Sequence, residues 1–505
     1  MNDSDTAPRG GLPPMPRSIY LSKVARRIDK KRLFFILLGL LLFCAVYFSP
    51  SWDDAVDPQG QHFSLTREGK AAIGLFLLAA TWWVFEVIPI GVTSITIGVI
   101  QVMFFIRPAK TAFGDFMDPS VWFIIGSIVI GLVFTKTGLT KRMAYKMLVL
   151  VGEKTSMIYL GTFVMTASLT LIMAHTAVAA TVFPLLMAIY SLYGENDKPT
   201  KFGKGLFIGM AFTAGAGSII TLLGAARGAV AIGFFNDIVG REISFFELTY
   251  YMLPVGAIMV FLLWGFLMII FKPEKKTIPG LRERAQTLYS RLGRITTKEI
   301  LTLIFVFSTI IFLGLGSIFP ELGKYHKSAV ILTATILFYI FKILTIADLE
   351  EVPWNIILLF GGAMSIGYCL WQTGAANWIA INWLVLFQNA HWFIFIMAIV
   401  FFVLIMTNFI MNVAAIAISI PVALVIAPYL GVAPEVILFA SLAAAGMPFL
   451  LLVGAAPNAI AYESKQFTSG EFFTSGIPAS ILLMVIIGIF VFVIWPLMGM
   501  PVLLN

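Results

Sequence analysis

Long apolar stretches recur from one end of the chain to the other, and they restrict it to a fold that lies in a lipid bilayer. An α-helix needs about 20 predominantly apolar residues to cross the hydrocarbon core. The 505-residue chain is 59% hydrophobic and only 12% charged, whereas a soluble protein averages about 25% charged residues. We therefore expect one all-α, polytopic membrane domain. The predicted spans are 33–49, 71–88, 90–106, 119–136, 204–235, 248–271, 298–318, 328–345, 352–371, 433–462 and 474–498.

Two more apolar stretches, 155–192 and 377–430, each contain a polar break. Residues 174–176 read Ala-His-Thr in the first stretch, and residues 411–413 read Met-Asn-Val in the second. Each stretch is either two spanning helices or one hairpin that enters the membrane and returns. In both cases the chain comes back to the side from which it started. The hairpin interpretation predicts about eleven transmembrane helices plus two re-entrant hairpins.

The positions of the basic residues predict the orientation of the chain. The N-terminal tail 1–32 and the segment 272–298 contain eight Lys and Arg residues each. Cytoplasmic loops carry such an excess, so both segments are expected in the cytoplasm, and the acidic loop 50–70 is expected outside. Eleven crossings then place the C-terminus outside the inner (cytoplasmic) membrane, with the first helix as an uncleaved anchor. Helix orientation explains the net charge of +8, and no nucleic-acid partner is implied.

The chain contains an internal repeat. Residues 121–138 and 357–374 share Gly, Gly, Thr and Gly in register, with an offset of 236 between Gly126 and Gly362. The further matches, in the same order, are HTAVAATVFP at 175–184 with NVAAIAISIP at 412–421, GAARGAVA at 224–231 with GAAPNAIA at 454–461, and Pro254 with Pro478. Gly, Ala and Pro are common in membrane helices, but four blocks in one order favour a true repeat. Five predicted crossings separate the two copies, and an odd number inverts the second copy.

The repeat divides the chain into four segments. They are a basic cytoplasmic tail (1–32), the first helix with the first inverted repeat (33–271), a basic cytoplasmic linker (272–298) and the second inverted repeat (299–505). Inverted repeats are typical of secondary transporters, whose substrate site lies near the midplane where broken helices meet. Non-helical backbone at that depth is tolerated only where it is buried or lines a wet cavity. We therefore expect the hairpin tips and the two Gly-Ala-Ala breaks to line the cavity.

Over roughly residues 70–498 the sequence resembles the divalent anion:sodium symporter family. The resemblance rests on TWWVFEVIP (81–89), the FIIG and LLFGG helices, two hairpin tips followed by Pro, and two Gly-x-x-Pro-Asn-like breaks, of which GAAPNAI (454–460) is the most specific. The resemblance implies an elevator-type carrier of C4-dicarboxylates, citrate or sulfate that is typically a homodimer. It also implies that Ser-Asn-Thr hairpin tips and adjacent backbone carbonyls hold sodium and contact the carboxylates of the substrate.

The hairpin tips and the first break depart from the family pattern. Ala174 and His175 stand where Ser and Asn are usual in the first tip, and of the second tip only Asn412 is retained. In the first break Arg227 replaces the usual Pro, and Gly228 replaces the usual Asn. Hard cations prefer oxygen ligands, and several hydroxyl and amide oxygens have been lost here. We therefore hypothesise that sodium coupling is weakened or lost, and that proton coupling through His175 or anion exchange replaces it.

Arg227 and His175 bring cationic chemistry to this region. A charged side chain at the midplane costs at least ~2.5–3.5 kcal/mol, so Arg227 needs a partner or a function. Its planar fork suits a carboxylate or a sulfate in two-point contact. The alternatives are a snorkelling side chain or an ion pair with Glu86 or Asp237. His175 can titrate near neutral pH, or it can simply bond a carbonyl of the broken helix.

The candidate site residues form two sets. The substrate-binding candidates are His175, Thr176, Arg227, Asn412, Val413, Pro457 and Asn458. The coupling-ion candidates are Thr170, Ala174, His175, Gly224, Thr407, Asn412 and Gly454. Asn412 can also cap a half-helix, while Thr170 and Thr407, one turn before the tips, can simply bond the preceding carbonyl.

Other classes of function are weighed against the carrier. An anion channel and a carrier of citrate or arsenite type are the alternatives. An intramembrane enzyme is disfavoured because His175 has no carboxylate three or four residues away, and no Walker-type phosphate loop occurs. The two cysteines, Cys44 and Cys369, lie in apolar segments and indicate neither a disulfide framework nor a metal cluster. No cofactor is expected beyond a coupling Na⁺ or H⁺.

Overall fold

The computed structural model describes residues 30–56, 61–193, 199–387 and 391–504. Most of the predicted basic tail, residues 1–29, lies outside the described residues. Helices make up most of the described structure, in agreement with the predicted all-α membrane fold. Within it the only two strands are β1 (Ala55–Val56) and β2 (His62–Phe63), a short antiparallel pair in the loop predicted at 50–70.

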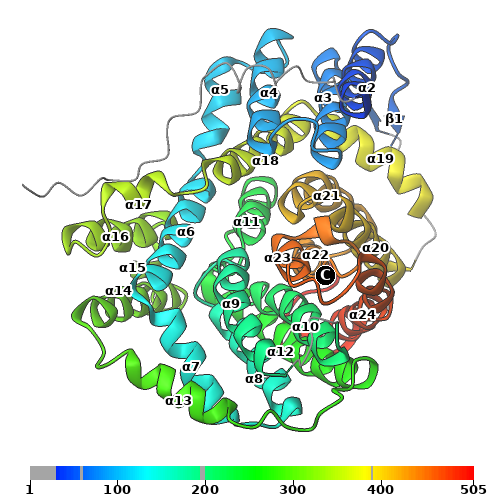
Figure 1. Cartoon of the computed structure of the whole chain (residues 1–505). Coiled ribbons are helices and arrows are strands. Elements are labelled where there is room, and N and C mark those ends of the chain that lie inside the picture. The colour runs from blue at the N-terminus through cyan, green and yellow to red at the C-terminus, as the bar shows by residue number, and fades with distance from the viewer. Residues whose placement is uncertain (1–29, 57–60, 194–198, 388–390, 505) are drawn as a thin grey trace, which may run out of the picture.

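The helices form two groups. We call the helices along the top and left of Figure 1 the outer group, and the helices that they surround the inner group. The outer group comprises α2 (Lys30–Tyr47), α3 (Arg67–Val84), α4 (Ile90–Met103), α5 (Ala109–Gly114), α6 (Pro119–Thr137), α7 (Leu139–Val151), α13 (Leu281–Arg291), α14 (Thr297–Leu315), α15 (Pro320–Gly323), α16 (Lys327–Ile340), α17 (Ile346–Glu350), α18 (Trp354–Gln372) and α19 (Ala375–Phe387). The inner group comprises α8 (Thr155–Leu169), α9 (His175–Tyr193), α10 (Lys201–Ser218), α11 (Ala226–Val239), α12 (Phe245–Ile270), α20 (Trp392–Phe409), α21 (Asn412–Ile426), α22 (Pro434–Gly446), α23 (Ala456–Tyr462), α24 (Ser469–Ile489) and α25 (Trp495–Leu497).

Eight of the described helical segments are long and apolar enough to cross a membrane. They are Ala109–Thr137, His175–Tyr193, Phe245–Ile270, Thr297–Leu315, Trp354–Gln372, Trp392–Phe409, Asn412–Leu430 and Ser469–Leu497. Four shorter apolar helices, α4, α8, α16 and α22, have 10–17 residues. The predicted number of about eleven crossings depends on how the shorter helices sit in the bilayer, so that number stays a prediction.

Local capping sequences fix the ends of α6. This helix begins after Asp118, whose Oδ1 accepts a hydrogen bond from Ser120 N at 2.7 Å, and Pro119 supplies the first helical φ. It ends at Gly138, which adopts the left-handed φ of 85° that glycine tolerates. The chain then turns directly into the basic helix α7. Asp118 and α7 are therefore held at opposite ends of α6.

Each of the two apolar stretches with a polar break folds back as a pair of helices. α8 and α9 are joined by residues 170–174, and α20 and α21 by residues 410–411. α9 and α21 begin inside the polar breaks, at His175 and Asn412. The second pair is shorter than the predicted range 377–430. The reason is that the His391 side chain caps the start of α20, so that the residues before it form the separate outer helix α19.

Two of the predicted spans are each divided into two helices. The span predicted at 204–235 contains α10 and α11, which are separated by residues 219–225. The span predicted at 433–462 contains α22 and α23, which are separated by residues 447–455. In both cases the second helix starts inside the Gly-Ala-Ala motif. Backbone groups that are freed in this way need partners or a polar cavity inside the protein.

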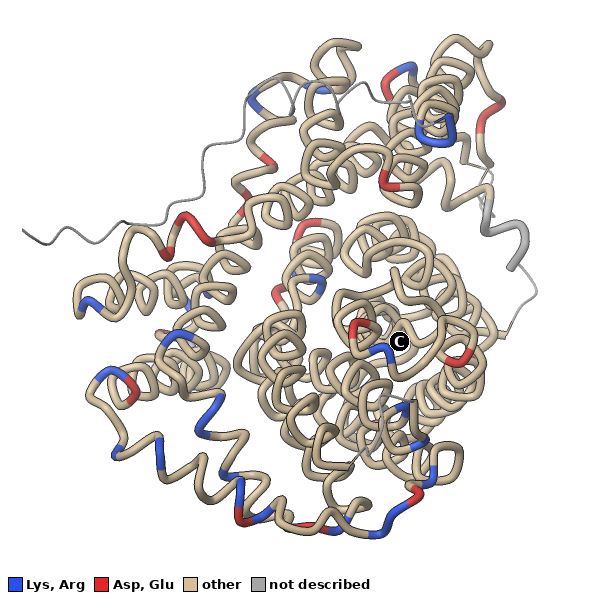
Figure 2. The backbone as a smooth tube through the Cα atoms, viewed as in Figure 1, with Lys and Arg blue, Asp and Glu red and all other residues tan. Residues whose placement is uncertain are grey.

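Basic side chains mark one edge of the molecule. Figure 2 shows Lys and Arg gathered along α7 and α13 and in the segment that leads from the inner group to α13, which belongs to the basic linker 272–298. α7 and α13 pack against each other. This edge is the one that the positive-inside rule assigns to the cytoplasm.

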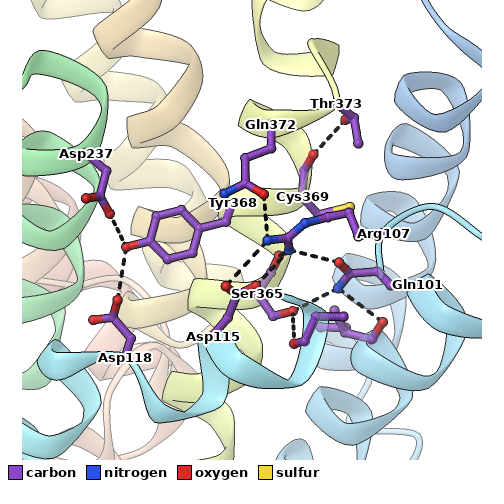
Figure 3. Close-up of polar contacts among 12 residues, drawn as sticks. Gln101, Arg107, Asp115, Asp118, Asp237, Ser365, Tyr368, Cys369, Gln372 and Thr373 are labelled. Atoms are coloured by element: carbon purple, nitrogen blue, oxygen red, sulfur yellow. Dashed lines mark hydrogen bonds and ion pairs between the residues drawn. The ribbon is translucent and has the colours of Figure 1, made fainter. Parts of the chain in front are cut away.

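A buried ion pair ties the outer group together (Figure 3). Arg107, between α4 and α5, is 5% exposed, and its Nη1 lies 2.7 Å from Asp115 Oδ2. The same guanidinium donates to Gln101 Oε1 on α4 at 3.0 Å and to Gln372 Oε1 at the end of α18 at 2.8 Å. Arg107 therefore joins α4, the segment before α6, and α18.

We expect Arg107→Gln to lower the free energy of unfolding by roughly 3–5 kcal/mol, because it leaves a buried carboxylate without its cation. Thermal unfolding of the purified protein measures the loss. Lys324→Gln removes an exposed cation that pairs with Glu321, so this control should cost less than about 1 kcal/mol. Equal melting temperatures for the two variants would contradict the structural role of Arg107.

Candidate functional site

A cavity of about 370 Å³ lies between the inner group and the outer helices α6 and α18. Both hairpin tips line it, through residues 174–177 and 411–413. Both breaks line it as well, through Ala225 and Ala226 in the first and residues 454–456 in the second. The structure thus brings four segments that are far apart in the sequence to one cavity.

Four helices begin at the wall of this cavity. α9 begins at His175, α11 at Ala226, α21 at Asn412 and α23 at Ala456, and all four residues are part of the lining. The first N–H groups of a helix have no acceptor within the helix, and the helix dipole adds positive partial charge at the same end. Three of these helices, α9, α11 and α21, have 14 or more residues. Their convergence makes the cavity a favourable place for an anion.

The lining carries no fixed charge. Among the described residues, none of those that line the cavity is Lys, Arg, Asp or Glu, and the one titratable side chain is His175. The polar side chains are hydroxyls and an amide, from Ser127, Thr135, Thr176, Thr181 and Asn412. A divalent anion would therefore find backbone dipoles but no matching cation in the wall, and burial of uncompensated charge is costly.

His175 is held against the first break. Its backbone N–H donates to Gly224 O at 3.0 Å, and its Nδ1 lies 3.3 Å from the same oxygen. A carbonyl oxygen only accepts hydrogen bonds, so this contact places a proton on Nδ1. The Gly224 carbonyl, a coupling-ion candidate, therefore already accepts two hydrogen bonds. The side chain bonds a broken-helix carbonyl, which was one of the two interpretations of this residue.

Asn412 and Thr176 present polar side chains to the cavity. Within the described residues neither side chain makes a hydrogen bond, although Asn412 is largely buried. The N-cap of α21 is Met411, and no side chain caps this helix, so Asn412 does not have the capping role considered from the sequence. A buried amide without a partner in the protein is available to a ligand.

Two asparagines brace the second break. Asn458 Nδ2 donates to Pro448 O at 2.8 Å and to Leu451 O at 3.1 Å. Asn408 Oδ1 accepts from Leu450 N at 2.8 Å. These amides satisfy backbone groups that the broken helix leaves unpaired. Asn408 was not among the predicted residues, although a lone amide at the end of an apolar helix was the signal for it.

Arg227 has a related position in the first break. Its side chain is 1% exposed, and Nη2 donates to Ser218 Oγ at 2.7 Å. Ser218 stands six residues before Gly224, as Pro448 stands six residues before Gly454. The guanidinium thus reaches the position that the Asn458 amide reaches in the second half.

The guanidinium of Arg227 lies outside the cavity lining. It lies at the end of α10, where Ser218 is the last residue, and beside the end of α22, where a Cβ on Gly446 would be 2.7 Å from Nη2. The C-terminal ends of helices favour positive charge. Neither Glu86 nor Asp237 pairs with it in the described structure, and its Nη1 has no hydrogen-bond partner there. Substrate contact by Arg227 therefore stays a prediction that this arrangement does not display.

The other predicted residues divide between the wall and the layer behind it. Ala174, His175, Thr176, Asn412, Val413 and Gly454 line the cavity. Thr170, Gly224, Arg227, Thr407, Pro457 and Asn458 lie outside its lining. Thr170 Oγ1 donates to Ala167 O at 2.6 Å, as an ordinary helix bond, whereas Thr407 Oγ1 donates across to Ala445 O in α22 at 3.0 Å.

A second cavity of about 370 Å³ adjoins the first and shares Thr135, Ala180 and Thr181 with it. It lies between α7, α9 and α13, and its lining includes Lys141 and Arg284. The pair of cavities leads from the hairpin tips to the basic edge of the molecule. An anion that enters from that edge would meet cationic side chains first.

Solved structures of two transporters share the fold. YdaH of Alcanivorax borkumensis has a TM-score of 0.55 at 12% identity, and the match covers 93% of this chain and 98% of that chain. MtrF of Neisseria gonorrhoeae, described as one of a class of antimetabolite efflux pumps, has a TM-score of 0.54 at 14% identity, with coverage of 92% and 94%.

Sequence relatives extend over almost the whole chain. The sodium-dependent dicarboxylate transporter SdcS of Staphylococcus saprophyticus is 25% identical over an alignment of 519 positions that covers 97% of each chain. SdcS of Staphylococcus aureus is 24% identical over an alignment of 496 positions that covers 92% of each chain. The family model of the sodium:sulfate symporter transmembrane region matches residues 40–501. The resemblance found in the sequence is thereby confirmed, and the chain belongs to the sodium:sulfate symporter family of multi-pass membrane transporters.

Proposed function

We propose that the chain is a secondary carrier that moves a C4-dicarboxylate together with sodium. The observation that carries this proposal is the convergence of helix N-termini on a cavity whose described lining has no fixed charge. Such a cavity attracts an anion but leaves its charge incompletely compensated. A cation that binds with the anion supplies the missing charge. Relatives named sodium-dependent dicarboxylate transporters support the same choice of substrate and ion.

The shape of the site supports a small dianion with separated charges. A volume of about 370 Å³ falls within the usual range of small-ligand sites. α9 and α21 start on different hairpins, so each carboxylate of a C4 chain can face one helix N-terminus with Thr176 or Asn412 beside it. Sulfate, which the family description names, is the second candidate, because the same N–H groups would donate hydrogen bonds to its oxygens.

The two breaks differ in what they offer to a sodium ion. In the first break, the Gly224 carbonyl accepts two hydrogen bonds from His175, and the charge of Arg227 is already present. In the second half, the Asn412 side chain of the hairpin tip has no partner within the described residues, and Gly454 of the break lies in the wall. We infer that Arg227 takes the place of one cation and that sodium binds beside the second break. Complete independence of sodium, hypothesised from the hairpin tips, is therefore not part of the proposal.

The same proposal includes an architecture and an orientation. The four segments predicted from the repeat make two inverted halves, and the inner group moves with both hairpins against the outer group in an elevator motion. The basic edge at α7 and α13 faces the cytoplasm, with the N-terminus inside and the C-terminus outside the inner membrane. Two copies form a homodimer, as the family resemblance implies.

Transport by purified protein in proteoliposomes tests the substrate and the ion. Uptake of labelled succinate should saturate and should stop when choline replaces sodium. Its dependence on sodium should have a Hill coefficient of about one, because one cation site is open. Saturable sulfate uptake without succinate uptake would move the assignment to sulfate. Undiminished succinate uptake in choline would contradict sodium coupling, and a large unsaturable anion current would favour a channel.

Exchanging the two breaks tests the role of Arg227. Arg227→Pro combined with Gly228→Asn copies the second break into the first, and the added Cβ at residue 228 meets only Leu222 Cδ2 at 3.3 Å. We expect the Hill coefficient for sodium to rise toward two, since a cation now has to supply the charge that the guanidinium supplied. Arg227→Lys keeps the charge and is the matched control. An unchanged sodium dependence in the double variant would contradict the inference that Arg227 takes the place of one cation.

Asn412→Ala should raise the KM for succinate about tenfold, because it removes one hydrogen bond to a charged group of the substrate. The melting temperature should not change, because the amide has no partner within the described residues. Asn408→Ala is the comparison: it removes a brace of the break and should lower the melting temperature. Initial uptake rates and thermal unfolding distinguish the two effects. A normal KM in Asn412→Ala would remove this residue from the site.

A further inference from the structure

A tyrosine joins the outer group to the inner group at the end of α6 that is opposite to α7. Tyr368 of α18 is 5% exposed, and its Oη lies 3.2 Å from Asp118 Oδ2 and within hydrogen-bond distance of Asp237 Oδ2 (Figure 3). Asp118 precedes the first residue of the outer helix α6, whereas Asp237 lies in the last turn of the inner helix α11. One hydroxyl therefore bridges carboxyl groups from both groups of helices.

The packing beside this tyrosine is also specific to the observed position of α11. The Phe234 ring lies over Gly367, where a Cβ would be 2.1 Å from Cζ, and meets the Tyr368 ring edge to face at a centroid distance of 5.3 Å. Phe234 precedes Asp237 by about one helical turn. The two helices are thus joined by the packing of Phe234 and by the hydrogen bond of Asp237, which are about one turn apart on α11. Neither contact could persist if α11 slid along α18.

The contact lies at the end of α6 that is away from the second cavity. α6 has 19 residues, a length of roughly 28 Å at 1.5 Å per residue. Asp118 and Tyr368 are at its first end, and the second cavity lies beside α7 at its other end. The two cavities thus lie toward one end of α6, while the contact of Tyr368 with the inner group lies at the other end.

We propose that Gly367 and Tyr368 form a latch with Phe234 and Asp237, and that this latch holds the carrier in the conformation that opens toward α7 and α13. The proposal rests on the proposed carrier function in one respect, the movement of the inner group against the outer group. Release of the latch is then a condition for the site to open at the other end. Tyr368 is a positioning residue, because it acts on the relative position of the groups and lies outside the cavity lining.

The latch also responds to protons. A hydroxyl has one proton to donate, so two ionised carboxylates cannot both accept it. Asp118 Oδ1 accepts from Ser120 N, and the start of α6 favours its negative charge, whereas the end of α11 disfavours that of Asp237. A protonated Asp237 can donate to Tyr368 Oη while Tyr368 donates to Asp118. Because the carboxyl groups part when the latch opens, the latched state holds this proton more tightly, and a rise in pH weakens the latch.

The other charged groups around the latch are engaged in ion pairs of their own. These pairs are Arg107–Asp115, Lys327–Glu242, Arg241–Glu247 and Arg241–Glu435. The helices α18 and α21, which also pack on α11, contain no charged residue. Lys327 of α16 lies 3.3 Å from Glu242, just beyond α11, so this pair is another polar contact between the two groups. Asp237 itself is exposed, which lets it exchange a proton with water.

Distances between spin labels on the two groups test the latch without any transport measurement. Cysteines replace the exposed Glu350 of the outer group and Glu463 of the inner group, in full-length protein with Cys44→Ser. Tyr368→Phe keeps the ring and removes the hydroxyl, and Gly367→Ala displaces Phe234. Each should shift the ratio of the two distance populations about tenfold away from the conformation seen here. Tyr339→Phe, which removes a hydroxyl that has no partner in the described structure, is the matched control and should shift nothing.

The same spin labels test whether the latch responds to protons. Between about pH 5 and about pH 8 the wild-type ratio should move away from the latched distance, and Asp237→Asn, which keeps a neutral donor at all pH values, should stay latched. Unchanged distances in both Tyr368→Phe and Gly367→Ala would overturn the latch, and a pH-independent ratio in the wild type would overturn its link to protons. Failure of the proposed function would be seen separately, as absent succinate uptake in a protein whose distances still respond.

Discussion

Backbone groups that are left unpaired inside an apolar medium are the constraint on which the rest of this structure depends. A helix that begins within the membrane must place its free N–H groups against partners or a polar cavity. Here four such starts, at His175, Ala226, Asn412 and Ala456, share one cavity. The wall can therefore attract an anion without a charged side chain. Because dipoles alone do not balance a dianion, the proposed carrier needs a cation that binds together with its substrate.

The two halves of the chain support their helix breaks with different side chains. Asn458 braces the second break with a neutral amide, whereas Arg227 reaches the related position of the first break with a permanent charge. His175 donates two hydrogen bonds to the Gly224 carbonyl oxygen, from its backbone N–H and from Nδ1. The departures from the family pattern are thus connected with one another: a charged side chain and two hydrogen bonds stand where oxygen ligands would be expected. The chain remains similar to relatives named sodium-dependent dicarboxylate transporters although its hairpin tips are altered.

The sequence allowed the breaks and the tips to be located, because polar triplets and Gly-Ala-Ala motifs interrupt long apolar runs. It did not indicate the direction of the Arg227 side chain, which depends on Ser218 and on the space beside Gly446 in another helix. The length of the second hairpin was overestimated because a capping histidine, His391, divides one apolar run into two helices. Tyr368 and Asp237 are 131 residues apart in the chain, and no local pattern pairs them. Long-range side-chain partners of this kind follow from the packing of α11 on α18.

The central claim is that a dicarboxylate binds between the hairpin tips and that its charge is balanced by helix N-termini, a bound cation and a distant arginine. An experimental structure determined with succinate and sodium tests it most directly. The account predicts succinate carboxylates at the starts of α9 and α21, within hydrogen-bond distance of Thr176 and Asn412, with Arg227 still turned toward Ser218. A succinate carboxylate paired directly with the Arg227 guanidinium, or bound away from both tips, would contradict it.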